Sequence, residues 1–165
     1  MAEPLDAIEL LTQDHRVIGE LLHQLDDERE PDRLRQLYLR LVGLLSAHEE
    51  AERLVVFPAL RAALPASGQD ASDRLGEHEE VNELLAEMRG LAPDGAGFEK
   101  RTSALILELQ NHFLNEEESA FPRLRAALAP EQLAELVERI EAVKRHAPAF
   151  PEPERAPNVH GGAPG

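Results

Sequence analysis

The sequence predicts an all-α protein: an up-down-up-down four-helix bundle followed by a fifth helix. Apolar residues recur at steps of three and four in five successive segments, the spacing of a helix with one buried face. Short stretches rich in Pro or Gly separate these segments, and such connections join neighbouring antiparallel helices. The sequence also repeats itself at an offset of 63 or 64 residues, which predicts two similar helical hairpins.

The first hairpin is expected to pair helices over about residues 5–29 and 32–63. Pro31 separates them, because proline suits the first turn of a new helix but not the interior of an existing one. Pro58 lies inside the second helix and should kink it, since its ring removes a backbone donor. The buried face of the first helix is expected to hold Ile8, Leu11, Ile18, Leu22 and Leu25.

The second hairpin is expected to repeat this pattern over about residues 70–91 and 98–127, with Pro122 in the place of Pro58. A fifth helix over about residues 131–145 follows Pro130 and should cap the bundle. From residue 146 the chain is rich in Pro, Gly and Ala and has no periodicity. We therefore expect one domain over residues 1–145 and a disordered tail over 146–165.

The composition restricts the classes of function. The absence of Cys from the 165 residues excludes disulfides, thiolate catalysis and Cys-ligated zinc or iron–sulfur sites. A net charge of −15 disfavours binding to nucleic acid and to anionic membranes. There is no secretory signal and no apolar run of membrane-spanning length, so a cytoplasmic location is expected, with no nucleic-acid or membrane partner.

Each repeat contains a His-x-x-x-Glu motif followed by Phe-Pro and Leu-Arg-Ala-Ala-Leu. The motifs are His48 with Glu52, and His112 with Glu116. Residues four apart share a helix face, with Cβ atoms about 6 Å apart, so each pair can chelate a cation. Both pairs fall on the apolar face, where an unpaired carboxylate would be costly. A cation between the two carboxylates removes that cost.

A single His lies 33 or 34 residues before each motif, at His15 and His78. Within each hairpin the two His lie about 16 or 17 residues from the connecting turn, so antiparallel packing brings them to one depth. Four imidazoles and two carboxylates suit two metal ions, each with two His, bridged by Glu52 and Glu116. Thiolate-free ligation favours iron, with manganese or zinc as alternatives. Open positions would hold a bridging oxygen and an exchangeable small ligand.

These motifs resemble those of the hemerythrin-like, or HHE cation-binding, domain over about residues 5–145. The resemblance implies a four-helix bundle around a non-haem di-iron centre, two iron ions with an oxo or hydroxo bridge. Oxygen-carrying members have a further His one turn after the third-helix His, where this chain has Asn82. Simple reversible O2 carriage is therefore disfavoured. The metal ligands implied are His15, His48, Glu52, His78, His112 and Glu116.

Several functional hypotheses share this site. The first is a cytoplasmic di-iron protein that binds or reacts with O2, peroxide or nitric oxide in stress sensing or defence, so that its partner is a small diatomic or peroxide ligand. The alternatives are an enzyme with catalase-like or oxidase activity, an iron-sensing or storage module, and a di-iron protein of iron–sulfur cluster repair. A bundle whose His and Glu only hydrogen-bond one another is the remaining alternative. These hypotheses differ in ligand access, redox potential and partners, which sequence patterns do not encode.

Overall fold

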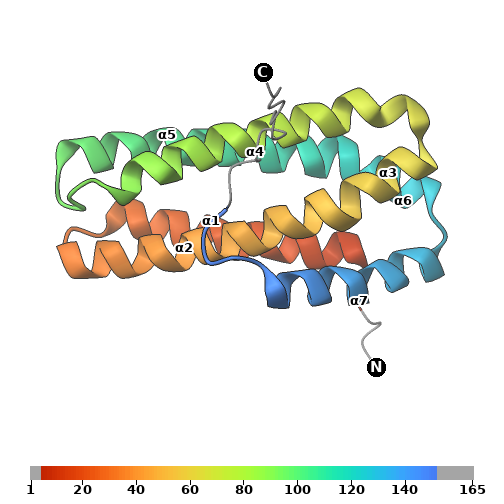
Figure 1. Ribbon diagram of the computed structural model, residues 1–165, viewed down its shortest axis with the longest axis horizontal. Coiled ribbons are helices and arrows are strands. Elements are labelled where there is room, and N and C mark those ends of the chain that lie inside the picture. The colour runs from red at the N-terminus through yellow and green to blue at the C-terminus, as the bar shows by residue number, and fades with distance from the viewer. Residues whose placement is uncertain (1–4, 152–165) are drawn as a thin grey trace, which may run out of the picture.

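A computed structural model describes residues 5–151 of the chain, apart from the side chain of residue 67. Four long helical segments lie side by side and antiparallel, and a fifth helix packs along the first hairpin (Figure 1). No strand occurs in the described range, and the predicted fold class is confirmed. In chain order the segments are α1 (Ala7–Asp27), α2 (Pro31–Ala51), the π-helical turn η1 (Glu52–Val56), α3 (Phe57–Ala63), the 3-10 turn η2 (Pro65–Ser67), α4 (Gly68–Arg89), α5 (Ala96–Asn115), the π-helical turn η3 (Glu116–Ala120), α6 (Phe121–Ala127) and α7 (Pro130–His146).

The starts of the first two helices follow from their capping residues. The Asp6 carboxylate accepts a hydrogen bond from the backbone N–H of Glu9, whose own carboxylate accepts from the N–H of Asp6. Glu30 accepts from two backbone N–H groups in the first turn of α2. Pro31 occupies that turn, where its missing N–H is not needed. Only residues 28–30 connect the end of α1 to the start of α2, and this short connection places the two helices antiparallel.

A π-helical turn stands where the sequence predicted each proline kink. In the first hairpin the N–H of Phe57 bonds to the carbonyl of Glu52, and in the second the N–H of Phe121 bonds to that of Glu116. A proline at the next residue cannot donate a backbone hydrogen bond, and a wider turn accommodates this locally. Each wide turn begins at the Glu of a His-x-x-x-Glu motif, so the duplication repeats the distortion as well as the residues.

Two clusters of buried apolar residues fill the bundle, one toward each end. Between them, along every long helix, lie the His and Glu of the repeated motifs. On α1, for example, Leu11 belongs to one cluster and Ile18 to the other, with His15 between them. The first cluster includes Ile18, Leu25, Tyr38, Leu41, Leu85, Phe98 and Leu105, and the second includes Leu11, Val55, Phe57, Leu60, Phe121, Leu124 and Ile140.

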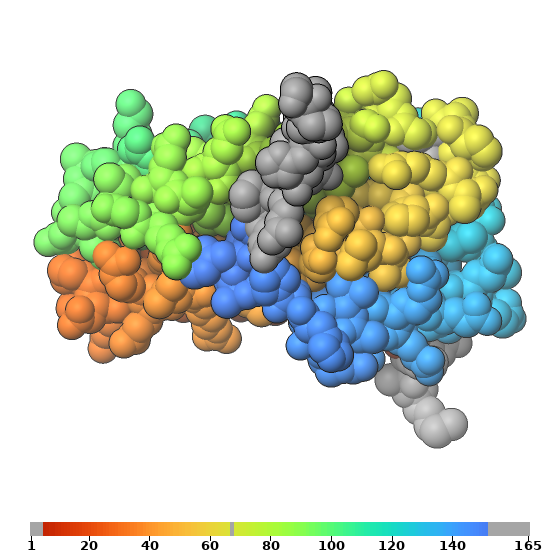
Figure 2. Space-filling view, viewed as in Figure 1, coloured from red at the N-terminus to blue at the C-terminus, as the bar shows by residue number. Residues whose placement is uncertain are grey.

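The C-terminal helix α7 contributes its apolar face to the second cluster and packs on α1 and α2. The tail predicted from residue 146 begins differently, because residues 147–151 lie on the bundle (Figure 2). The Ser46 hydroxyl donates to the carbonyl of Pro148 at 2.6 Å, and Phe150 packs against the first cluster beneath the Arg89 guanidinium. Partial burial of the Phe150 ring against this cluster favours the docking. Residues 152–165, the rest of the predicted tail, lie outside the described residues.

The helices of residues 5–151 are too polar or too short to cross a lipid bilayer.

One of these helices carries a glycine that the helix does not require. Gly43 lies inside α2, and apart from its chain neighbours and the adjacent backbone of its own helix, no atom lies within 4 Å of where its Cβ would stand.

Gly43→Ala should therefore stabilise the protein. Glycine inside a helix costs roughly 0.5–1 kcal/mol relative to alanine, because glycine loses more backbone freedom on folding. We expect the free energy of unfolding to rise by that amount in urea titrations of metal-free protein. A lower free energy of unfolding would show that the space beside Gly43 is not available to a methyl group.

Candidate metal centre

All six predicted ligand side chains meet in the polar layer between the two apolar clusters. The four His residues are at most 5% exposed and the two Glu residues are fully buried. Each hairpin contributes one His from its first helix, one His from the last turn of its second, and the Glu that begins the π-helical turn. Their positions are His15 on α1, His48 on α2, Glu52 in η1, His78 on α4, His112 on α5 and Glu116 in η3.

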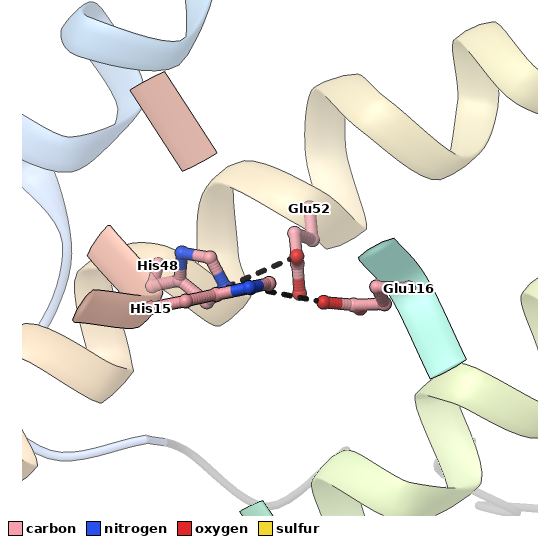
Figure 3. Close-up of side chains that lie close together, drawn as sticks. All are labelled: His15, His48, Glu52 and Glu116. Carbon is pink, nitrogen blue, oxygen red and sulfur yellow. Dashed lines mark hydrogen bonds and ion pairs between the residues drawn. The ribbon is translucent and has the colours of Figure 1, made fainter. Parts of the chain in front are cut away.

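The ligating atoms form two groups that share both carboxylates. The first group is completed by His15 and His48, and the second by His78 and His112. Within each group all four ligating atoms lie within 4.8 Å of one another. Figure 3 shows the first group, with both imidazoles directed toward the carboxylates of Glu52 and Glu116.

Each carboxylate divides its two oxygens between the two groups. Glu52 places Oε1 at 3.1 Å from His48 Nε2 and Oε2 at 3.0 Å from His78 Nε2. Glu116 places Oε2 at 3.2 Å from His15 Nε2 and Oε1 at 3.0 Å from His112 Nε2. A cation bound in either group would therefore contact both carboxylates.

The other ring nitrogen of three of these imidazoles contacts a further carboxylate. Because an ionised carboxylate only accepts, Nδ1 carries the proton and donates, and in a neutral ring Nε2 then offers its lone pair to the centre. The three rings are therefore oriented for metal binding through Nε2. The contacts are His15 Nδ1 to Glu117 at 2.7 Å, His48 Nδ1 to Asp14 at 3.1 Å and His112 Nδ1 to Glu77 at 2.5 Å.

With neutral rings, these lone pairs converge on carboxylate oxygens that have no hydrogen-bond donor. All four oxygens of Glu52 and Glu116 are buried and unpaired in this sense. Unpaired buried carboxylates are too costly to persist, so protons or cations must lie between the nitrogens and the oxygens. The donor set, two imidazoles and two carboxylate oxygens per group, fits divalent or trivalent metal ions.

The electrostatics of the metal-free centre show how strongly it attracts positive charge. Burial alone would lower the pKa of His48, but Glu52, Asp14 and Glu116 outweigh it and raise the pKa to about 10. For Glu52, burial alone would raise the pKa of the carboxyl group. The surrounding imidazoles, His48 first among them, outweigh burial and hold this pKa well below its usual range. The same negative field that retains protons favours metal cations.

The family model of the hemerythrin HHE cation-binding domain matches residues 6–124, most of the chain. This chain is a hemerythrin-like protein of the HHE family. The predicted resemblance is therefore confirmed, and a cation-binding domain is the context in which the two His and Glu groups occur.

The hemerythrin fold is also shared with a solved structure. An HHE cation-binding domain-containing protein from Mycobacterium kansasii superposes with a TM-score of 0.76, covering 87% of each chain at 23% identity. An uncharacterized hemerythrin-like protein of Schizosaccharomyces pombe is 24% identical over 147 residues, 88% of this chain and 72% of that one. A DNA nickase of Nostoc sp. is 24% identical over 136 residues, 82% of this chain, which spans only 38% of the nickase.

The carboxylates that contact Nδ1 in this hemerythrin-like centre were not predicted from the sequence. Two of them had a signal, because Asp14 and Glu77 directly precede the first His of each hairpin and correspond in the duplication. Each contacts the imidazole on the other helix of its hairpin. Glu117 had no such signal, because its counterpart in the first hairpin is Arg53, which pairs with Glu50 instead.

Lys144 extends this outer contact to the fifth helix. Its ammonium group donates to both oxygens of Asp14, at 2.6 and 2.7 Å, while Asp14 contacts His48. The C-terminal helix thus supports the orientation of one predicted ligand. The duplication offers no counterpart for this contact, since α7 follows the second hairpin only.

Asp14→Asn should weaken metal binding without unfolding the bundle. The amide is a poorer acceptor for the His48 N–H, and loss of such a contact lowers metal affinity by about 10-fold or more. Competition with a chelator of known iron(II) affinity measures this. Asp26→Asn, on the exposed surface of the same helix, is the control and should leave affinity unchanged. Equal affinities for Asp14→Asn and the wild type would contradict the role of Asp14.

Proposed function

We propose that this hemerythrin-like protein holds two iron ions and uses them to bind or react with O2, peroxide or nitric oxide in stress sensing or defence. The observation that carries the proposal is the division of both Glu carboxylates between two His pairs. When bound, two adjacent iron ions would supply Lewis acidity and redox chemistry to a small ligand. The chain itself orients the imidazoles, supplies the negative charge of the two carboxylates and surrounds the centre with buried apolar side chains.

The choice of iron follows from the donor atoms. Each group combines two imidazole nitrogens with two carboxylate oxygens and has no thiolate, since the chain contains no Cys. Such mixed nitrogen and oxygen sets suit iron, and four protein atoms per ion leave positions for a small ligand. Manganese and zinc are the competing ions, and spectroscopy after loading separates them from iron.

The class of ligand follows from burial and charge. The side chains around the centre are nearly or fully buried and lie between two apolar clusters, so a ligand must be small to reach it. A net charge of −15 opposes approach of a nucleic-acid backbone or an anionic membrane. DNA nicking, the activity named for the Nostoc protein, is therefore not proposed for this chain. We propose a small molecule as the partner of this chain.

The test is to load the protein anaerobically with iron(II), count the iron and expose separate samples to O2, hydrogen peroxide and nitric oxide. We expect two irons per chain and new visible absorption bands with at least one of the three ligands. His23→Ala is the control, because His23 is exposed on α1 and away from the centre. Fewer than two irons per chain, or an absorption spectrum that none of the ligands changes, would overturn the proposal.

A further inference from the structure

The two halves of the centre differ at two positions that the duplication relates. Glu49 follows His48, whereas Phe113 follows His112 at the corresponding place. Asn82, one turn after His78, likewise corresponds to Gly19. One half of the centre therefore has a polar pair where the other has an aromatic ring and a glycine.

On the side of the first His pair, the aromatic ring covers the centre. Phe113 stacks on the His15 ring with centroids 3.9 Å apart and an interplanar angle of 13°, and it also lies edge-on to His48. An apolar ring offers a ligand no hydrogen bond there. The Phe113 ring therefore blocks a ligand on this side and gives it no hydrogen bond.

On the side of the second His pair, two buried oxygen atoms lack partners. Glu49 is only 7% exposed, and its Oε1 has no hydrogen-bond donor, like Oδ1 of Asn82. Both of the atoms without partners are oxygens, so the pair presents hydrogen-bond acceptors to a ligand.

These two residues also line a groove that reaches a predicted ligand. The groove has a volume of about 960 Å³, is lined by Glu49, Asn82 and His78, and has the exposed Glu79 and Glu83 at its rim. His78 is the one imidazole of the four whose Nδ1 has no carboxylate contact within residues 5–151. The groove thus leads from the surface to the less constrained His of the second pair.

We propose that the small ligand approaches the ion held by His78 and His112 through this groove, where Glu49 and Asn82 accept hydrogen bonds from it. Hydrogen peroxide carries two O–H donors that can satisfy both acceptors. Neither O2 nor nitric oxide carries a donor, so either would leave both buried oxygens unpaired. Sites built to hydrogen-bond a ligand discriminate strongly against analogues without the matching group. The pair therefore favours hydrogen peroxide, an inference that rests on the proposed two-ion centre.

The test compares two probes on the iron-loaded full chain. Hydrogen peroxide has donors, whereas azide is an anion without donors and binds without turnover. In Glu49→Gln and Asn82→Leu we expect the hydrogen peroxide concentration that half-saturates the iron-loaded chain to rise by about 10-fold or more. This is the effect of losing a hydrogen bond to the ligand. Azide affinity, measured by absorption titration, should not fall in either variant, because azide donates no hydrogen bond to Glu49 or Asn82. Both variants should retain two irons per chain.

Two controls place the ligand and separate charge from hydrogen bonding. Glu83→Gln removes one charge from the exposed rim of the groove, and Gly19→Ala adds a methyl group at the counterpart of Asn82. Neither should change the peroxide concentration dependence. An equal effect of Gly19→Ala and Asn82→Leu, or parallel weakening of both probes in the groove variants, would overturn the inference. Failure of the wild type to bind two irons would instead overturn the proposed function, and this inference with it.

Discussion

Glu52→Gln is expected to reduce iron binding from two ions per chain to one or none. The carboxylate faces His48 with one oxygen and His78 with the other, so a cation beside either His would contact it. The amide keeps the shape but replaces one oxygen by an N–H2 group, which points hydrogens at a cation. Loss of an anionic ligand shared by two ions should lower affinity by more than about 100-fold, beyond the 10- to 100-fold effect of outer contacts. Iron content after gel filtration, with chelator competition, measures the loss.

Two further variants make this result specific. Glu116→Gln should behave in the same way, because Glu116 serves the opposite pairing of His15 and His112. Glu50→Gln removes a carboxylate from the same stretch of helix, but Glu50 pairs with Arg53 at the surface, and its iron content should match the wild type. Retention of two tightly held irons by Glu52→Gln would contradict a bridging role for this carboxylate.

Chelation of the metal is expected to lower the melting temperature by roughly 10 °C. Ions that bind only the folded chain stabilise it by about 4 kcal/mol at a thousandfold excess over Kd, and in a chain of this size each kcal/mol shifts the melting temperature by about 2–4 °C. The metal-free centre must hold protons instead, as the raised pKa of His48 indicates. Scanning calorimetry of iron-loaded and chelated protein measures the shift.

The variant without the first bridge provides the internal control. Chelator should shift the melting temperature of Glu52→Gln by less than that of the wild type, since the variant binds one ion or none. If the wild type melted at one temperature in both conditions, the centre would not be coupled to folding. That result would contradict two tightly held ions inside the bundle.

The sequence predicted the meeting of the six His and Glu side chains because their placement follows from simple geometry. Helical periodicity puts His15 and His48 on buried faces, and equal distances from the connecting turn put them at one depth. The duplication then repeats this for His78 and His112. No long-range information is needed beyond antiparallel packing of neighbouring helices.

Other features depend on contacts that periodicity does not describe. The π-helical turns at Glu52 and Glu116 are a response of the backbone to the proline that follows, where a kink was the expectation. The docking of Phe150 depends on a surface built from distant helices, and so does the contact of Lys144 with Asp14. Glu117 reaches His15 across the two hairpins, a pairing that its own repeat position does not suggest.

Anomalous diffraction at the iron absorption edge, on crystals of the iron-loaded chain, tests the two-ion centre most directly. Two peaks are expected between the carboxylates of Glu52 and Glu116, one beside His15 and His48 and the other beside His78 and His112. A single peak, or peaks away from these six side chains, would contradict the shared two-iron centre.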